Sequence, residues 1–101
     1  MHPPKNMRAV IGGKRYSVAT SELLAGDDHW DGHNFERSGT NTFLYRTKRG
    51  SYFAVHLTQW QGSRNYIDPL GQDDALSLFE SLSEQRVEAE DAFPGVKIEE
   101  A

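Results

Sequence analysis

The segment from Asn41 to Trp60, NTFLYRTKRGSYFAVHLTQW, decides the fold of this chain. Apolar and polar residues alternate on both sides of Thr47-Lys48-Arg49-Gly50, as they do along strands that bury one face. A glycine at the end of such a turn tolerates the left-handed conformation that closes a short loop with a bulge. The segment therefore predicts one long antiparallel hairpin.

The position of the turn also predicts the register of the hairpin. With Thr47 opposite Ser51, the pairs that follow are Arg46 with Tyr52, Tyr45 with Phe53, Leu44 with Ala54, Phe43 with Val55 and Thr42 with His56. One face, which we name the aromatic face, carries Phe43, Tyr45, Phe53, Val55 and Leu57. The other, the mixed face, carries Thr42, Leu44, Arg46, Tyr52, Ala54, His56, Thr58 and Trp60. Because a shift by one residue would bury Arg46 and His56, we predict that the aromatic face forms the core.

Length and composition bound the class of protein. The 101 residues accommodate one domain, which we expect at residues 7–95 with flexible ends at 1–6 and 96–101. The absence of cysteine excludes disulfides, thiolate metal ligands and a cysteine nucleophile. No apolar run reaches the ~18 residues of a membrane span, and residues 1–6 lack a signal-peptide pattern, so we predict a cytoplasmic protein without a membrane partner.

The segments around the hairpin complete an α+β fold. Residues 7–18 predict a first hairpin turning at Gly12-Gly13, with Ala9 opposite Tyr16, Met7 opposite Val18, and Ile11 on the inner face. Residues 19–25 predict a short helix in which Leu23 and Leu24 face inward. Ser17 or Thr20 is expected to cap its start, and Gly26 to end it. Residues 27–40 predict a polar loop and residues 61–64 a turn.

The C-terminal third predicts one main helix. Residues 65–68 predict a short return strand that Pro69 ends. A helix is expected from Gly71 or Asp73 to about Leu82, with its apolar stripe at Ala75, Leu76, Phe79 and Leu82. For residues 86–93 we favour a last strand over a continuation of the helix. The expected fold is thus an antiparallel sheet of four or five strands that packs one face on the main helix, with the short 19–25 helix closing an edge.

Several of these segments resemble a group of small bacterial, archaeal and phage-borne proteins. The resemblance rests on Leu44-Tyr-Arg-Thr-Lys-Arg-Gly-Ser-Tyr-Phe53, on Ile67-Asp-Pro-Leu70, on the helix start at Asp74-Ala75, and on Lys14-Arg15-Tyr16 with residues 21–25. It spans roughly residues 14 to 80, and its motifs are structural ones. The group has no established activity, so the resemblance implies a compact α+β fold and a link to mobile elements, without any catalytic residue.

One cluster offers metal ligands. Asp27-Asp28-His29-Trp30-Asp31-Gly32-His33 holds two imidazoles and three carboxylates, ligand types suited to zinc or another divalent metal. Gly26 before the cluster and Gly32 within it disfavour the helix that would place His29 and His33 on one face. We therefore predict a solvated loop and neither metal nor cofactor; a metal-binding hydrolase using His29, His33 and Asp31 is the alternative.

The central hairpin carries the remaining candidates. His56 has the chemistry of a general base, but no partner for it is evident in the sequence, and we predict no catalytic residue. We expect a small non-enzymatic interaction module, phage-related or accessory to a mobile element, whose partner is another protein or a second copy of the chain. The residues expected to bind that partner are Leu44, Arg46, Lys48, Arg49, Tyr52, His56 and Trp60.

Nucleic acid is the alternative partner. Arg46, Lys48 and Arg49 gather at the tip of the hairpin, Tyr52 lies near, and Lys14 and Arg15 lie on the first hairpin; a basic β-ribbon of this kind enters grooves or binds single strands. The formal net charge of −4, from 15 acidic and 11 basic residues, argues against generic binding to polyanions.

Overall fold

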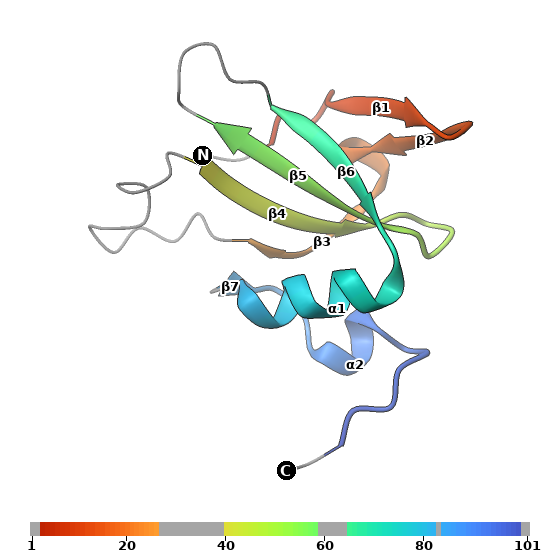
Figure 1. The fold of residues 1–101 in the computed structure, drawn as a ribbon, viewed down its shortest axis with the longest axis vertical. Coiled ribbons are helices and arrows are strands. Elements are labelled where there is room, and N and C mark those ends of the chain that lie inside the picture. The colour runs from red at the N-terminus through yellow and green to blue at the C-terminus, as the bar shows by residue number, and fades with distance from the viewer. Residues whose placement is uncertain (1–2, 27–39, 59–64, 83, 100–101) are drawn as a thin grey trace.

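The computed structural model describes residues 3–26, 40–58, 65–82 and 84–99. The loop predicted at 27–40 lies outside this part up to residue 39, and so do Trp60 and the turn predicted at 61–64. In chain order, the elements are β1 (Arg8–Ile11), β2 (Lys14–Ser17), the 3-10 turn η1 (Val18–Thr20), β3 (Glu22–Gly26), β4 (Thr40–Arg46), β5 (Tyr52–Thr58), β6 (Tyr66–Leu70), α1 (Gln72–Ser81), β7 (Glu84–Gln85) and α2 (Ala89–Ala92) (Figure 1).

The central hairpin has the predicted register. β4 and β5 pair Thr42 with His56, Tyr45 with Phe53 and Arg46 with Tyr52, as expected from the turn. Thr47 N–H donates to the Ser51 carbonyl at 2.8 Å, and Gly50 takes a φ of 89°, the left-handed conformation for which glycine was expected. The local pattern of this segment was therefore enough to place every pair.

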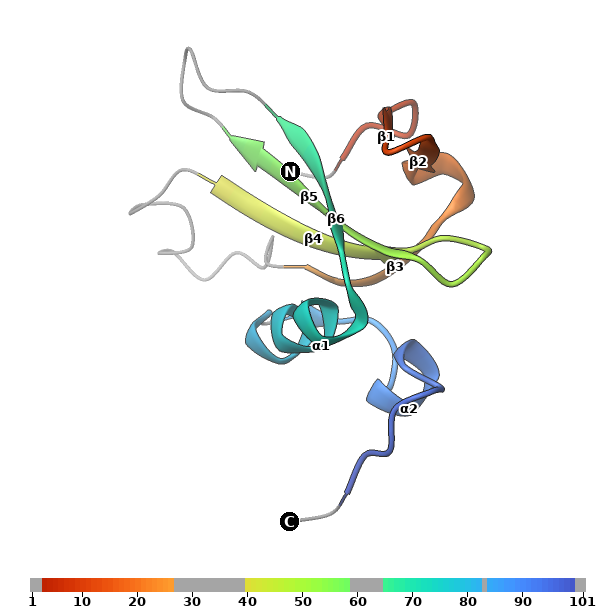
Figure 2. The same ribbon diagram turned by 45° about the vertical axis from the view of Figure 1, so that its right-hand side comes forward.

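The α+β class is confirmed. Within the described residues, a five-stranded antiparallel sheet has the order β6-β5-β4-β3-β7, and β1 and β2 form a separate two-stranded sheet. Figure 2 shows the two layers that cover the large sheet, with the β1–β2 hairpin on one side and α1 and α2 on the other. Neither helix among the described residues has the length and apolar character of a membrane span.

The first hairpin is confirmed except at its tip. Ala9 pairs with Tyr16, Val18 N–H donates to the Met7 carbonyl at 3.1 Å, and Gly12 and Gly13 have φ of 60° and 79°. Ile11, which was expected on the inner face with Ala9, is 38% exposed and does not join the core. The reason is that the half of the hairpin away from its turn packs on the sheet, through Met7, Ala9, Tyr16 and Val18.

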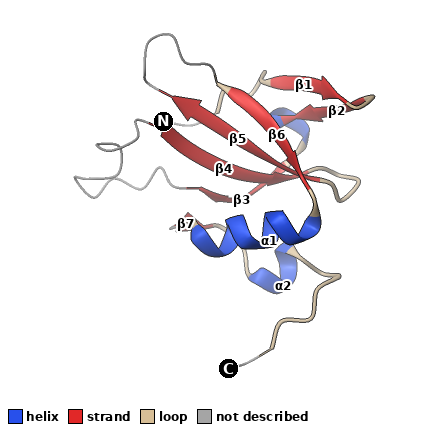
Figure 3. Ribbon diagram, viewed as in Figure 1, coloured by secondary structure: helices blue, strands red, loops and turns tan. Residues whose placement is uncertain are grey.

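The predicted 19–25 helix is wrong. After η1 the chain runs as strand β3 between β4 and β7 (Figure 3). A helix of this length is marginal without tertiary packing, and pairing with β4 satisfies the backbone instead. Nor does Gly26 end a helix: a Cβ there would lie 2.9 Å from Cδ1 of Phe43, so glycine is needed for close packing inside the sheet. The Ser17 side chain makes no cap hydrogen bond.

The return strand and the main helix lie where they were expected. β6 pairs with β5 and extends through Pro69 to Leu70, so the expectation that Pro69 ends the strand is wrong. Proline is tolerated there because β6 is an edge strand. Gly71 is the N-cap of α1, Asp73 and Asp74 lie in its first turn, and Leu82 follows its last residue.

One face of the sheet packs on the main helix, as expected, and that face is the mixed one. The aromatic face packs against the β1–β2 hairpin, through a cluster that includes Tyr16, Val18, Phe43, Phe53 and Val55. α1 packs on the opposite side in a second cluster with Leu24, Ala25, Leu44, Tyr52, Ala75, Phe79, Leu82, Ala92 and Phe93. The register shift between Leu23 and Ala25 marks a bulge in β3, and Leu24 and Ala25 add to the apolar surface on which the helix packs.

The strand predicted at 86–93 is also wrong. β7 is limited to Glu84 and Gln85, and α2 follows it. Ala89, Ala92 and Phe93 lie at the spacing of one helical face, and all three pack in the core that α1 covers. The C-terminal segment thereby becomes the second cover of the mixed face.

Candidate functional site

Two apolar residues of the mixed face that were expected to bind a partner are buried. Leu44 is fully buried and Tyr52 is 8% exposed, because Phe93 of the C-terminal segment stacks on the Tyr52 ring with centroids 4.9 Å apart. These two side chains therefore do not offer the exposed contact that partner binding would need. Trp60, another residue expected to bind the partner, lies outside the described residues.

The Arg46 side chain makes hydrogen bonds within the protein. Its guanidinium donates to the backbone carbonyls of Asp91 at 2.7 Å and Ala92 at 2.9 Å, and to Oε1 of Glu22 at 2.6 Å. The Tyr52 hydroxyl also donates to the Ala92 carbonyl, at 2.8 Å. Together these bonds hold the end of α2 against the central hairpin.

We expect Arg46→Gln to lower the free energy of unfolding by about 1.5–3 kcal/mol, the range for hydrogen bonds made by charged groups. Arg46→Lys should restore less than half of this loss, because an ammonium cannot reproduce the planar fork that reaches Glu22 and both carbonyls. Urea unfolding measures both values. Arg49→Gln, an exposed change on the same turn, is the control, and equal stability of Arg46→Gln and this control would contradict the role of Arg46.

His56 has partners that the sequence analysis did not assign. Its Nδ1 lies 3.3 Å from Oγ1 of Thr42, its cross-strand neighbour, and its Nε2 lies 3.9 Å from Oδ2 of Asp68. The ring stacks on Tyr66 at a centroid distance of 4.6 Å. The Thr42 contact follows from the predicted register, whereas the contacts with β6 required the register of a third strand that the sequence did not specify. In this setting His56 ties β6 to the centre of the sheet.

The metal-ligand candidates His29, Asp31 and His33 lie outside the described residues. Within the residues that the structure describes, no group of three or more histidine, cysteine, aspartate or glutamate side chains could hold a metal ion.

A basic groove lies between the two hairpins. Lys14 and Arg15 line it from β2, and Lys48 and Arg49 line it from the β4–β5 turn. The groove has a volume of about 600 Å³, and all four cationic side chains belong to exposed residues. Among the described residues that line it there is no carboxylate, while Thr20, Thr47 and Ser51 contribute hydroxyl groups. These cations belong to two hairpins that the sequence predicts, and the packing of one hairpin on the other brings them to one groove.

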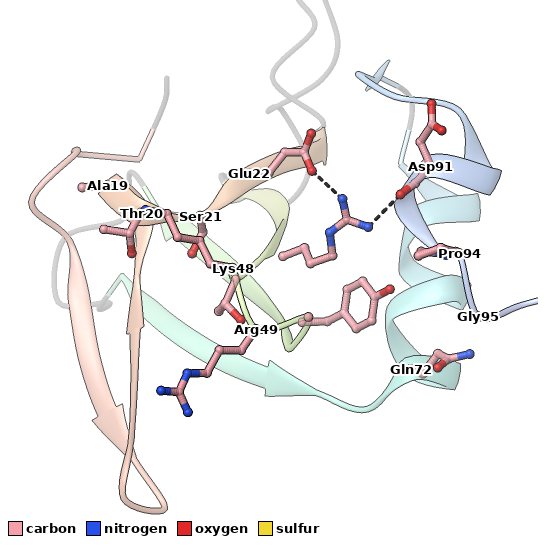
Figure 4. Close-up of a pocket in the computed structure, with 14 residues that line it drawn as sticks. Ala19, Thr20, Ser21, Glu22, Lys48, Arg49, Gln72, Asp91, Pro94 and Gly95 are labelled. Carbon is pink, nitrogen blue, oxygen red and sulfur yellow. Dashed lines mark hydrogen bonds and ion pairs between the residues drawn. The ribbon is translucent and has the colours of Figure 1, made fainter.

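A larger cavity adjoins the basic groove (Figure 4). It has a volume of about 890 Å³ and shares Thr20, Thr47, Lys48 and Arg49 with the groove. Its far side belongs to the C-terminal segment, through Asp91, Pro94 and Gly95, and Gln72 from the start of α1 also lines it. In Figure 4, the Arg49 side chain extends away from that segment. The turn that carries Lys48 and Arg49 thus separates two hollows of different composition.

Comparison with known proteins finds no match among family models, curated proteins or solved structures. The resemblance to small phage-borne and prokaryotic proteins therefore stays a prediction.

Proposed function

We propose that this chain is a non-enzymatic binding module whose partner is nucleic acid, held by its phosphates in the basic groove. The observation that carries the proposal is the gathering of Lys14, Arg15, Lys48 and Arg49 around one groove without an acidic lining residue among those described. In a protein with a net charge of −4, such a gathering of like charge is unfavourable unless an anion offsets it.

The composition of the groove suits phosphate. Arginine and lysine are the side chains that bind phosphate oxygens, and hydroxyl groups such as those of Thr47 and Ser51 add neutral donors. The negative net charge does not oppose this, because charges further than about 8–10 Å from the groove are screened at physiological salt. The distribution of charge, rather than its sum, supports a polyanionic partner.

A protein partner is less well supported. Protein interfaces have a desolvated core enriched in aromatic and other apolar side chains. The aromatic residue of the groove, Tyr16, is 8% exposed and packs on Phe53, and the apolar side of the mixed face is covered. The resemblance to phage-borne proteins is compatible with a nucleic-acid-binding accessory role.

The proposal predicts that Lys48→Gln/Arg49→Gln weakens binding to a labelled mixed-sequence oligonucleotide. Each phosphate contact that is lost should also reduce the slope of log affinity against log salt by about 0.7 to 0.9. Fluorescence anisotropy over a series of salt concentrations measures both effects. Lys5→Gln/Lys97→Gln has the same net charge and changes exposed residues outside the groove, so it should keep wild-type affinity.

Two outcomes would overturn the proposal. The first is no detectable binding of either single-stranded or duplex oligonucleotide at low salt. The second is binding of polyglutamate as tight as binding of the oligonucleotide, with the same dependence on Lys48 and Arg49, which would assign the groove to acidic protein segments.

A further inference from the structure

We infer that the nucleic acid is single-stranded and that one unpaired base occupies the cavity next to the basic groove. This inference rests on the proposed function and specifies its ligand. The groove and the cavity share Lys48 and Arg49 on the β4–β5 turn and Thr20 and Thr47 beside it. A strand with a phosphate on the basic side of this turn therefore reaches the cavity with an adjoining base.

The charges of the two hollows favour different parts of a nucleotide. Among the described residues, two acidic residues line the cavity and none lines the groove. One is Glu22, whose carboxylate forms an ion pair with Arg46 at 2.6 Å, and the other is Asp91, an exposed residue. In Figure 4, the Asp91 carboxylate points away from the other lining side chains. The cavity shares Lys48 and Arg49 with the groove but is not lined by Lys14 and Arg15, so a phosphate meets more cations in the groove than in the cavity. The cavity thus suits a neutral base better than a phosphate.

The remaining lining suits a planar group with polar edges. The Gln72 side chain offers both a donor and an acceptor, and Pro94 with Gly95 provides apolar surface. A volume of about 890 Å³ is within the usual range for sites that hold small molecules.

The wall formed by the C-terminal segment is held in place before any ligand arrives. Arg46 and Tyr52 donate three hydrogen bonds to the carbonyls of Asp91 and Ala92, directly before Phe93 and Pro94. Phe93 anchors the same segment in the core. A site that is already ordered loses less conformational entropy on binding.

Duplex nucleic acid does not offer a base to such a cavity. Its bases are paired and stacked, and removing one from the helix requires unstacking and unpairing. The phosphates of a duplex remain available to the basic groove. Wild-type protein should accordingly bind a single strand at least about tenfold more tightly than a duplex of the same sequence, the effect expected from one well-packed base contact.

The test compares three oligonucleotides of one sequence: a single strand, its duplex, and a single strand with abasic sites that keeps every phosphate. With wild-type protein, anisotropy should show that the abasic strand loses about tenfold in affinity relative to the intact strand. This comparison involves no substitution and so does not depend on the folding of a variant.

Gly95→Trp provides the matching change in the protein. Gly95 lines the cavity, its φ is not positive, and a Cβ there meets nothing within 4 Å, so an indole can fill the cavity without backbone strain. We expect about a tenfold loss of affinity for the intact single strand and none for the duplex. Ser77→Trp places the same ring on an exposed position of α1 outside the cavity and should leave every affinity unchanged.

The outcomes separate the two proposals. If intact strand, abasic strand and duplex bind equally, and Lys48→Gln/Arg49→Gln weakens all of them, the base site is overturned and the basic groove stands. Unchanged affinity of Gly95→Trp for the intact strand would likewise overturn the base site. Failure of all three oligonucleotides to bind at low salt would overturn the groove as well.

Discussion

Replacing Phe53 by alanine is expected to lower the free energy of unfolding by ~3–5 kcal/mol, the loss typical of emptying a buried aromatic site. Phe53 lies at the centre of the aromatic face and has no exposed surface. Its ring stacks on Tyr45 with centroids 5.3 Å apart and meets the Tyr16 ring edge-on at 5.6 Å. The substitution therefore removes contacts within the large sheet and between that sheet and the β1–β2 hairpin.

Urea unfolding followed by circular dichroism measures this loss. The control is Val10→Ala, which shortens a residue that is 63% exposed on the β1–β2 hairpin and should change the free energy by no more than about 0.5 kcal/mol. If Phe53→Ala and Val10→Ala were equally stable, the aromatic face would not form a core.

Phe93→Ala is expected to lower the free energy of unfolding by a similar amount, ~3–5 kcal/mol. Phe93 is fully buried, stacks on Tyr52 at 4.9 Å and meets Phe79 of α1 edge-on at 5.6 Å. It is the point at which the C-terminal segment enters the core of the mixed face. Its loss should also release the segment that Arg46 and Tyr52 hold.

Hydrogen exchange separates this effect from a general loss of stability. In Phe93→Ala, the Ala92 and residue 93 amides, which donate to the carbonyls of Glu88 and Ala89, should exchange faster than those of β4 and β5. Ile98→Ala, at a 40% exposed position further along the segment, should leave these rates unchanged. Equal protection of the segment in Phe93→Ala and wild type would show that Phe93 does not anchor it.

The two substitutions should have nearly independent effects. Phe53 and Phe93 belong to separate clusters on opposite sides of the sheet. Substitutions without shared partners usually add their effects on stability to within about 0.5 kcal/mol.

The candidate site could be predicted only in part. The charges of Lys14, Arg15, Lys48 and Arg49 are visible in the sequence, and so is their position near two hairpin turns. Their meeting around one groove depends on the first hairpin packing over the aromatic face, which no local pattern specifies. Arg46 was grouped with these cations because it precedes the same turn, although its partner carbonyl on Asp91 lies 45 residues away.

The sequence by itself determined the central hairpin, its register, the first hairpin turn and the main helix. Each of these depends on neighbours a few residues apart: alternation along a strand, a glycine at positive φ, and a stripe at helical spacing. The tertiary structure alone decided that residues 22–26 pair as a strand, that α1 covers the mixed face, and that residues 89–93 close the second core. These features arise from burial and backbone pairing between segments far apart in the chain, and such contacts override the weak local preferences of short segments.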